Sequence, residues 1–408
     1  MPIDTGDTTW MLISTGLVMM MTPALGFFEA GLIRAKNTLS IIMQTFSGLA
    51  ILSILWFIIG FTLVFAPSQG GIIGGLDWFF FNNVPMNDSV DYAPTIPGVT
   101  FASYQMMFAV ITPLLITGAF AERLKWSSFF VFIIAWSLVV YYPLAHWIWG
   151  RGWLADLGVF DFAGGIVIHT SAGLGSLAAA LVLGRRKNFG PDIMVPHNIP
   201  LAVIGASLLW IGWFGFNAGS ALASGSLAAN TLLVTHIASA TSAMVWIGLS
   251  WKRSGKPSTT AVINGAIAGL AGVTPAAGFI SAQNSFLLGI VLGFASYYAI
   301  LLLKEHLKID DALDVSSVHG VTGIIGALAI GIIASTAINP AGPDGLAYGN
   351  PIQFAIQALG VAVAAVVGFV GTVVIMKVID VTMGLKVKEE EEDIGLDITQ
   401  HAERAYVT

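Results

Sequence analysis

Cysteine is absent from this chain of 408 residues, and charged side chains make up only 10% of it. The absence of cysteine excludes disulfides, thiolate metal sites and a cysteine nucleophile. Soluble domains carry about 25% charged residues, whereas this chain is 56% hydrophobic and has a mean hydropathy of +0.83. The composition therefore indicates a polytopic membrane protein.

The sequence motifs of common enzymes and energy-consuming pumps are also missing. No Walker sequence, glycine-rich dinucleotide turn or Ser-His-Asp pattern occurs in a suitable context, and no third metal ligand recurs at a ligand spacing. We expect neither an enzyme nor a pump, no cofactor, no metal and no nucleic-acid partner. Residues 1–7 are acidic where a secretory signal is basic, so we also expect no cleaved signal peptide.

The chain is rich instead in apolar segments long enough to span about 30 Å of hydrocarbon. Eleven are predicted, near residues 9–33, 40–66, 100–121, 126–148, 163–184, 198–219, 227–251, 260–277, 285–303, 315–338 and 352–384. The eighth and ninth are the weakest, because glycine and proline thin their apolar signal. The predicted fold class is an all-α membrane protein with eleven transmembrane helices, a membrane domain over 1–384 and a tail over 385–408.

Basic residues predict the orientation of these helices. Lysines and arginines fall at the exits of odd-numbered helices or in the tail: Arg34, Lys36, Arg123, Lys125, Arg185, Arg186, Lys187, Lys252, Arg253, Lys256, Lys304, Lys308, Lys377, Lys386, Lys388 and Arg404. Only Arg151 falls on the other side. Because basic loops stay in the cytoplasm, we expect an external N-terminus and a cytoplasmic C-terminus in the inner (cytoplasmic) membrane. The connection 67–99 is then an external loop, interpreted as a plain connector.

A first internal echo concerns two histidines. Val167-Ile168-His169 is followed by Gly173, and Ser317-Val318-His319 is followed by Gly323 at the same interval. Both histidines fall inside predicted helices, where ionisable residues are costly and mark pathways. We interpret His169 and His319 as a facing pair of imidazoles that line one narrow pore and share or accept a proton. The alternative is two separate packing histidines.

A second echo pairs residues 28–31 of the first helix, Phe-Glu-Ala-Gly, with residues 216–219 of the sixth, Phe-Asn-Ala-Gly. In the predicted topology, helices one and six run in opposite directions, as do helices five and ten. This arrangement is typical of two inverted five-helix repeats with a pathway at their interface. The eleventh helix then stands outside the repeats.

Asp161 precedes the fifth helix in the stretch Asp161-Phe162-Ala163-Gly164-Gly165. An acid at a helix N-terminus is stabilised by the free backbone N–H groups and by the helix dipole, so a capping role is expected. A carboxylate at a pore entrance would also stabilise a nearby cation. The two roles are compatible.

Aromatic residues gather toward the predicted outer face. They are Phe101, Tyr104, Phe108, Trp147, Trp149, Trp153, Trp210, Trp213, Phe214 and Phe216. Most aromatics at this depth form an interfacial belt, although a few could form a cage for a small cation. Spacing alone leaves both interpretations open.

The remaining charges receive structural interpretations. Glu29 lies near the inner end of the first helix, and Glu122-Arg123 is interpreted as an interfacial ion pair. Asp310, Asp311 and Asp314 are interpreted as a solvated or capping cluster, and the acidic run 389–393 as a solvated tail.

The stretch from Asp161 to Gly165, followed by His169, resembles the signature of the ammonium transporter family, the Amt, Mep and Rh proteins. Further similar stretches follow in order: 31–37, 116–123, 212–220, 272–276, 314–320, 395–397 with His401, and 405–406. The resemblance covers essentially the whole chain, and such an ordered series is highly specific.

The resemblance implies a fold and a mechanism. The fold is an eleven-helix protomer with a five-plus-five inverted repeat, assembled as a homotrimer with one pore per subunit. The mechanism is capture of ammonium, its deprotonation, and passage of ammonia through a hydrophobic pore, with the proton conveyed separately in electrogenic members. A dry pore agrees with this, since neutral ammonia avoids most of the desolvation cost of a cation.

Family roles carry over to matching positions. The resemblance implies that Trp149, Phe108 and Ser220 form an external ammonium recruitment site, with Asp161 as the acid needed for recognition or deprotonation. It implies that Phe108 and Phe216 form a stacked gate beneath that site, and that His169 and His319 are the twin-histidine pair.

The resemblance also implies partners, namely methylammonium as an analogue and a PII-type (GlnK-like) regulatory protein at the tail. Two positions depart from the family pattern: Glu29 lies where bacterial members commonly have Tyr-Gly-Gly, and Ala402 replaces a tail glycine. Two other functions stay open. An ammonium sensor would keep the same pore and continue into a signalling domain, and a channel for neutral solutes would leave Trp149, Ser220 and Asp161 unexplained.

Overall fold

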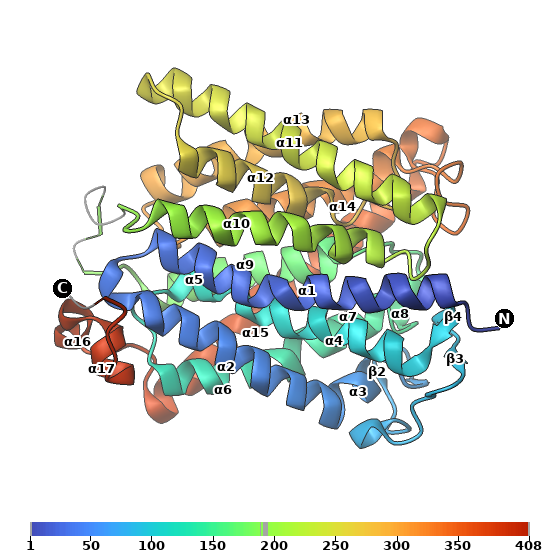
Figure 1. Cartoon of the computed structure of the whole chain (residues 1–408), viewed down its shortest axis with the longest axis horizontal. Coiled ribbons are helices and arrows are strands. Elements are labelled where there is room, and N and C mark those ends of the chain that lie inside the picture. The colour runs from blue at the N-terminus through green and yellow to red at the C-terminus, as the bar shows by residue number, and fades with distance from the viewer. Residues whose placement is uncertain (1, 188, 191–194, 407–408) are drawn as a thin grey trace.

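The computed structural model describes residues 2–187, 189–190 and 195–406. Long helices run side by side along the longest axis, and the two termini lie at opposite ends (Figure 1). We call these ends the N-side and the C-side. The start of α1 (Thr5–Leu32) lies on the N-side, whereas α16 (Glu389–Ile394) and α17 (Leu396–His401) lie on the C-side (Figure 1).

Ten helical stretches of the described residues are long and apolar enough to cross a membrane. They are Thr5–Leu32, Ala35–Phe65, Gly98–Phe120, Trp126–Asp156, Gly165–Leu183, Ile199–Ala218, Ser226–Ser254, Ala282–His306, Ser316–Ile333 and Ile352–Met383. The segment predicted near 260–277 forms a shorter apolar helix, α12 (Thr259–Val273). The helix ends before Pro275, which has no N–H with which to continue it.

Several spans are built from more than one helical element. The remaining α-helices are α2 (Thr38–Leu55), α3 (Phe61–Phe65), α4 (Gly98–Leu114), α5 (Thr117–Phe120), α6 (Trp126–Trp136), α7 (Tyr142–Ile148), α8 (Trp153–Asp156), α9 (Ser171–Leu183), α10 (Ile199–Trp213), α11 (Ser226–Ser254), α13 (Ala282–Ile300), α14 (Thr322–Ile333) and α15 (Ile352–Met383). π-Helical turns join or begin some of them: η2 (Trp56–Gly60), η4 (Ser137–Tyr141), η5 (Gly165–Thr170), η7 (Phe214–Ala218), η8 (Leu301–His306) and η9 (Ser316–Val321). Short 3₁₀ turns are η1 (Ala35–Asn37), η3 (Phe79–Phe81) and η10 (Leu346–Tyr348).

The connection 67–99 folds into two small antiparallel hairpins on the N-side. Strands β1 (Ser68–Gln69) and β2 (Ile73–Gly74) pair with each other, as do β3 (Ser89–Val90) and β4 (Ala93–Pro97). Asp4 donates its backbone N–H to Thr95, so the start of the chain is held against β4. The loop predicted as a plain connector is therefore ordered secondary structure that covers this end of the bundle.

Glycine lets α1 and α10 approach closely. A Cβ on Gly31 would lie 2.5 Å from the Ala202 nitrogen, and a Cβ on Gly205 would lie 2.3 Å from the Phe28 nitrogen. Helices in lipid gain little from hydrophobic burial against one another, so close van der Waals packing of small residues holds them together. Gly31, near the end of α1, contacts the start of α10, so the two helices run antiparallel.

The two glycines of the histidine echo make reciprocal contacts at the centre of the bundle. A Cβ on Gly173 would lie 2.2 Å from the Gly320 Cα, and a Cβ on Gly323 would lie 2.8 Å from the His169 Cβ. Each glycine thus lies against the segment that carries the other half's histidine. Without these glycines, the two segments could not cross at this distance.

A buried network of charges joins several helix ends on the C-side. Glu122 accepts hydrogen bonds from Arg34 Nε and Arg186 Nη1, both at 2.9 Å. Asp310 pairs with Arg186 at 2.8 Å and with Arg123 at 2.9 Å. The predicted pair between Glu122 and Arg123 is therefore wrong, because each side chain finds a partner from a distant segment.

Burial alone would raise the pKa values of the network's acids. For Glu122, the charges and hydrogen bonds of Arg186 and Arg34 outweigh burial and hold its pKa below the ordinary value. For Asp310, Arg186 and Arg123 do the same. Both carboxylates are therefore ionised and paired, and Asp310 does not belong to a solvated cluster.

The acidic segment of the tail is exposed at Glu389, Glu390 and Asp393, as predicted, but is docked at Glu392. Glu392 is buried and accepts the Lys187 backbone N–H at 2.9 Å. Asp397 accepts the Ser40 backbone N–H at 2.8 Å, and Asn37 Oδ1 accepts the Leu396 N–H at 2.8 Å. The interpretation of 389–393 as a solvated tail is therefore wrong for Glu392, since α16 and α17 pack against the C-side of the bundle (Figure 1).

Candidate functional site

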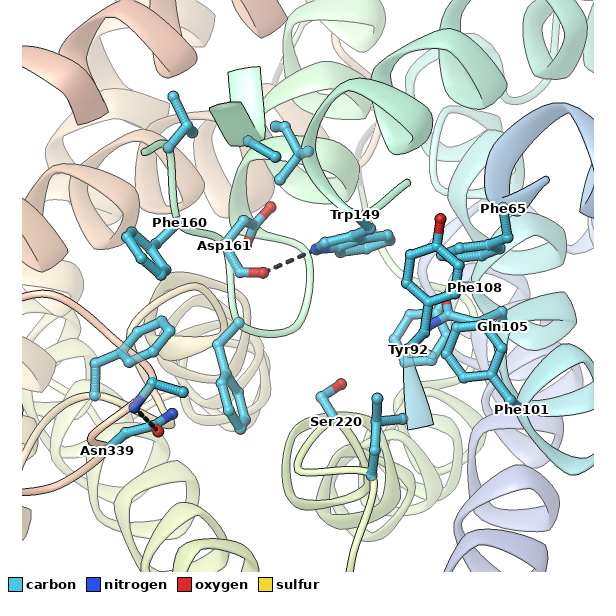
Figure 2. Close-up of a pocket in the computed structure, with 17 residues that line it drawn as sticks. Phe65, Tyr92, Phe101, Gln105, Phe108, Trp149, Phe160, Asp161, Ser220 and Asn339 are labelled. Carbon is cyan, nitrogen blue, oxygen red and sulfur yellow. Dashed lines mark hydrogen bonds between the residues drawn. The ribbon is translucent and has the colours of Figure 1, made fainter. Parts of the chain in front are cut away.

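A cavity with a volume of about 510 Å³ opens on the N-side. We call it the N-side cavity. Its lining includes Trp149, Phe108, Asp161 and Ser220, four residues that the sequence resemblance groups together. Figure 2 shows Trp149 and Ser220 on opposite sides of an open space, with Phe108 beside them.

Hydrogen bonds fix the groups that surround this space. The Trp149 indole N–H donates to the Asp161 carbonyl at 2.8 Å (Figure 2), and its ring meets the Phe108 ring edge-on at a centroid distance of 6.2 Å. The Ser220 hydroxyl donates to the Phe216 carbonyl at 2.8 Å. Two ring systems and the lone pairs of a hydroxyl therefore border the cavity, which is suitable for a small cation that also donates hydrogen bonds.

The Asp161 carboxylate caps the helical segment that follows it. Its two oxygens accept the backbone N–H groups of four successive residues, from Gly164 to Val167, at 2.7–2.9 Å. These are the N–H groups that a helix N-terminus leaves without partners. The predicted capping role is confirmed. The carboxylate fixes where η5 begins, and so fixes the indole through the Asp161 carbonyl.

Phe108 and Phe216 lie where the N-side cavity ends. Their ring centroids are 4.5 Å apart, and their planes are tilted by 58° rather than stacked as predicted. Both rings are almost fully buried. Phe108 lines the N-side cavity and Phe216 lines the next one, so the two rings separate the cavities.

The central cavity is narrow and apolar, with a volume of about 20 Å³, which is near the minimum that holds one water molecule. His169 and His319 supply its ring nitrogens. The other lining residues are Met21, Leu25, Phe28, Ile111, Leu115, Leu209, Trp213, Phe216 and Ile267. A hydrated ion does not fit in this space.

The two imidazoles contact each other directly. His169 Nδ1 and His319 Nδ1 are 3.2 Å apart, and the rings are nearly parallel, at 27°. A hydrogen bond between two Nδ1 atoms needs a proton on one of them only. In the neutral pair, one ring then carries its proton on Nδ1 and the other on Nε2, so one Nε2 is an acceptor and the other a donor. His169 Nε2 is buried and has no partner among the described residues.

Three segments with π-helical turns position these side chains. His169 lies in η5, His319 in η9 and Phe216 in η7. A π-helical turn adds a residue to the helical repeat and is common at functional sites. Trp213, just before η7, stacks on His169 at 5.6 Å and donates its indole N–H to Thr274 at 2.9 Å.

A third cavity of about 190 Å³ lies on the C-side and is lined by charged residues. We call it the C-side cavity. Leu32, Glu122, Arg186, Lys304 and Asp314 are among its lining residues. The three cavities follow one another from the N-side to the C-side. Within the described part of the chain, no group of three His, Asp or Glu side chains is placed to hold a metal ion.

A comparison with protein families decides where this architecture belongs. The model of the ammonium transporter family matches residues 9–406 of the chain. This chain belongs to the ammonium transporter family. The resemblance drawn from Asp161–Gly165 and His169 is thereby confirmed at the level of the family.

Relatives in this family are similar over almost the whole chain. Ammonium transporter 1 of Dictyostelium discoideum is 57% identical over 99% of this chain and 88% of its own length. Ammonium transporter Amt1 of Archaeoglobus fulgidus is 43% identical over 98% of this chain and 99% of its own. Among solved structures, Candida albicans Mep2 superposes with a TM-score of 0.89 at 34% identity, covering 95% of this chain and 88% of Mep2. A sensor Amt protein superposes at 0.88 with 29% identity, covering 97% and 98%.

Some residues that line the N-side cavity were not predicted from the sequence. Gln105 and Tyr92 line the N-side cavity. Gln105 gave one usable signal, since it is a polar residue inside an apolar predicted helix. Tyr92 gave none, because it comes from the loop 67–99.

Proposed function

We propose that this family member transports ammonium across the cytoplasmic membrane. Ammonium binds in the N-side cavity, loses a proton near Phe108 and Phe216, and crosses the central cavity as ammonia. The observation that carries the proposal is the pair of imidazoles in a narrow apolar cavity between two wider ones. Moving a bare cation into such a space is far more costly than moving a neutral molecule.

The N-side cavity supplies the selectivity in this proposal. Trp149 and Phe108 present π-systems, which attract a cation by about 0.5–2 kcal/mol. The Ser220 hydroxyl presents lone pairs that can accept a hydrogen bond from an N–H group of ammonium. Methylammonium carries the same charge and most of the same donors, so it is expected to be accepted as an analogue. Asp161 acts by holding Trp149 and the start of η5 in place.

The imidazole pair supplies a route for the proton. An Nε2 acceptor on one ring and an Nε2 donor on the other allow a proton to enter one side of the pair and leave from the other. Ammonia and proton then cross separately, and the transport carries net charge.

The membrane arrangement proposed with this function is the one that the sequence predicts. It has eleven helices in two inverted repeats plus α15, an external N-side, a cytoplasmic C-side and a homotrimer with one pore per subunit. The reciprocal contacts of Gly173 and Gly323 and the antiparallel packing of α1 and α10 support the repeats. The docked part of the tail, described over residues 385–406, supports binding of a PII-type (GlnK-like) protein on the cytoplasmic face.

A sensor is the second candidate function, favoured by the structural similarity to a protein described as a sensor Amt protein. Electrophysiology of proteoliposomes on a solid-supported membrane separates the two. A transporter gives a sustained current after an ammonium pulse, which Asp161→Ala abolishes. A sensor gives only a brief binding transient, and that outcome contradicts the proposal.

A further inference from the structure

Glu29 is a buried carboxylate of α1 that lines neither the central cavity nor the C-side cavity. It lies near the end of α1 and is 2% exposed. Of the elements packed on this part of α1, the helices α2, α4 and α10 contain no charged residue and no histidine. The short turn η1 contributes Lys36, whose ammonium donates to the backbone carbonyls of Glu392 and Asp393. An acid held at membrane depth is expensive and marks a route for protons or ions more often than a packing contact.

Glu29 lies on or beside the face of α1 that borders the proposed pathway. Leu25 and Phe28 line the central cavity with the histidines, and Leu32 lines the C-side cavity. Glu29 follows Leu25 by one helical turn, about 6 Å toward the C-side. Its place along the pathway is therefore between the imidazoles and the charged cavity.

The carboxylate also lies under the segment that carries His319. Glu29 Oε2 accepts the Thr117 hydroxyl at 2.7 Å. Oε1 is 2.9 Å from where a Cβ on Gly118 would lie, and Val315 Cγ2 is 2.7 Å from the same point. Val315 precedes His319 by four residues, so the two side chains lie roughly one above the other on their helix. Glu29 therefore lies close to the start of the segment that carries His319.

Within the described part of the chain, Glu29 and Asp311 form no ion pair, whereas the neighbouring acids do. Asp314 is paired with Lys304 at 2.7 Å, and Glu122 is paired with Arg34 and Arg186. Asp311 caps η9 by accepting the Ser316 N–H and hydroxyl. Asp311 Oδ1 is buried and has no hydrogen-bond partner among the described residues. Among the described residues, the Glu29 carboxylate therefore has a hydroxyl, that of Thr117, as its hydrogen-bond partner rather than a cation.

We propose that Glu29 is the group that accepts the proton from the imidazole pair and releases it to the C-side cavity. This role rests on the proposed function. One N–H bond of ammonium breaks on the N-side, the proton rests on an imidazole nitrogen, and an O–H bond forms at Glu29. The proton then leaves to water on the cytoplasmic side, where ammonia takes up a proton again.

The test compares Glu29→Gln with the wild-type chain in proteoliposomes after an ammonium jump. Glutamine keeps an oxygen for Thr117 but accepts no proton. We expect the sustained current to fall by about 100-fold or more, the scale of losing a positioned proton acceptor. We also expect the wild-type current to vary with the pH of the C-side compartment and the variant's current to lose that dependence. Thr117→Val keeps the carboxylate and is expected to lower the current by much less.

A Glu29→Gln chain with wild-type current and wild-type pH profile overturns the role of Glu29. If Glu29→Gln does not fold, Glu29→Asp replaces it, because its shorter carboxylate retracts from Thr117. A lower current with a displaced pH profile then supports the role, and an unchanged profile overturns it. A wild-type chain that gives only a binding transient contradicts the proposed function itself, which is a different failure.

Discussion

The two ends of the pathway use different chemistry. The N-side cavity is bordered by aromatic rings and a hydroxyl, and its one nearby carboxylate, that of Asp161, is occupied by four backbone N–H groups. The C-side is built from ion pairs among Arg34, Glu122, Arg186 and Asp310. An entrance that attracts a cation weakly can bind it selectively and still release it. A network of ion pairs instead holds helix ends in fixed positions. The comparison predicts binding defects from changes on the N-side and stability defects from changes on the C-side.

The largest expected effect is on the C-side. Arg186→Leu leaves Glu122 and Asp310 with one guanidinium partner fewer in a buried place, which costs about 3–5 kcal/mol of the free energy of unfolding. Thermal unfolding in detergent measures it. Arg253→Leu is the matched control, because its pair with Glu305 is exposed and is worth at most about 1 kcal/mol. Equal midpoints for the two variants would show that the network does not hold the helix ends.

The next effect lies at the crossing between the two ends. Gly173→Ala places a Cβ 2.2 Å from the Gly320 Cα, which forces the histidine-bearing segments apart. Overpacking of this kind costs about 1–3 kcal/mol, and we expect the ammonium current to fall as the imidazoles separate. Gly248→Ala is the control, since its Cβ would meet nothing within 4 Å. If Gly173→Ala kept both wild-type stability and current, the close crossing would not be needed.

A smaller effect is expected at the entrance. Trp149→Leu removes a ring face from the N-side cavity and should raise the ammonium concentration for half-maximal current by about 2- to 30-fold, which corresponds to about 0.5–2 kcal/mol of cation–π attraction. Trp147→Leu is the control, because Trp147 does not line that cavity. The stability of both variants should stay close to that of the wild type. A similar shift in the two variants would argue against a specific cation site.

The smallest effect near neutral pH is the pH dependence of stability. The pKa values of Glu122 and Asp310 are lower in the folded protein than their ordinary values of 4.5 and 3.8. Their stabilisation is therefore fully present above those ordinary values and is lost as the pH falls below them. As the pH is lowered through that range, the thermal unfolding midpoint should decrease. The fall should be shallower in Arg186→Leu, and an equal slope would contradict the assignment.

Sequence patterns predicted the parts of this molecule that repeat or that follow a period. Apolar runs gave the helical spans, and the echo around His169 and His319 brought two distant histidines into one hypothesis. The structure places their Nδ1 atoms 3.2 Å apart. The family could be predicted from motifs in a fixed order, because that order is a property of the sequence and does not depend on knowing the tertiary contacts.

Pairings between distant segments could not be predicted in the same way. Glu122 and Arg123 are neighbours in sequence, yet their partners come from residues 34, 186 and 310. The acidic run 389–393 looked solvated because composition does not reveal that Glu392 meets the Lys187 backbone. The tilt of Phe108 against Phe216 depends on packing around π-helical turns, which leave no pattern in a single sequence.

The central claim is that the imidazole pair carries the proton through a pore too dry for a cation. The most direct test is the ammonium-driven current of the double variant His169→Asn, His319→Asn in proteoliposomes, with the folded state checked by thermal unfolding. Asparagine keeps hydrogen-bonding groups near the Nδ1 positions but does not titrate. We predict a folded protein whose sustained current falls by about 100-fold or more, as expected when a positioned proton carrier is lost. A folded double variant with wild-type current would contradict the account.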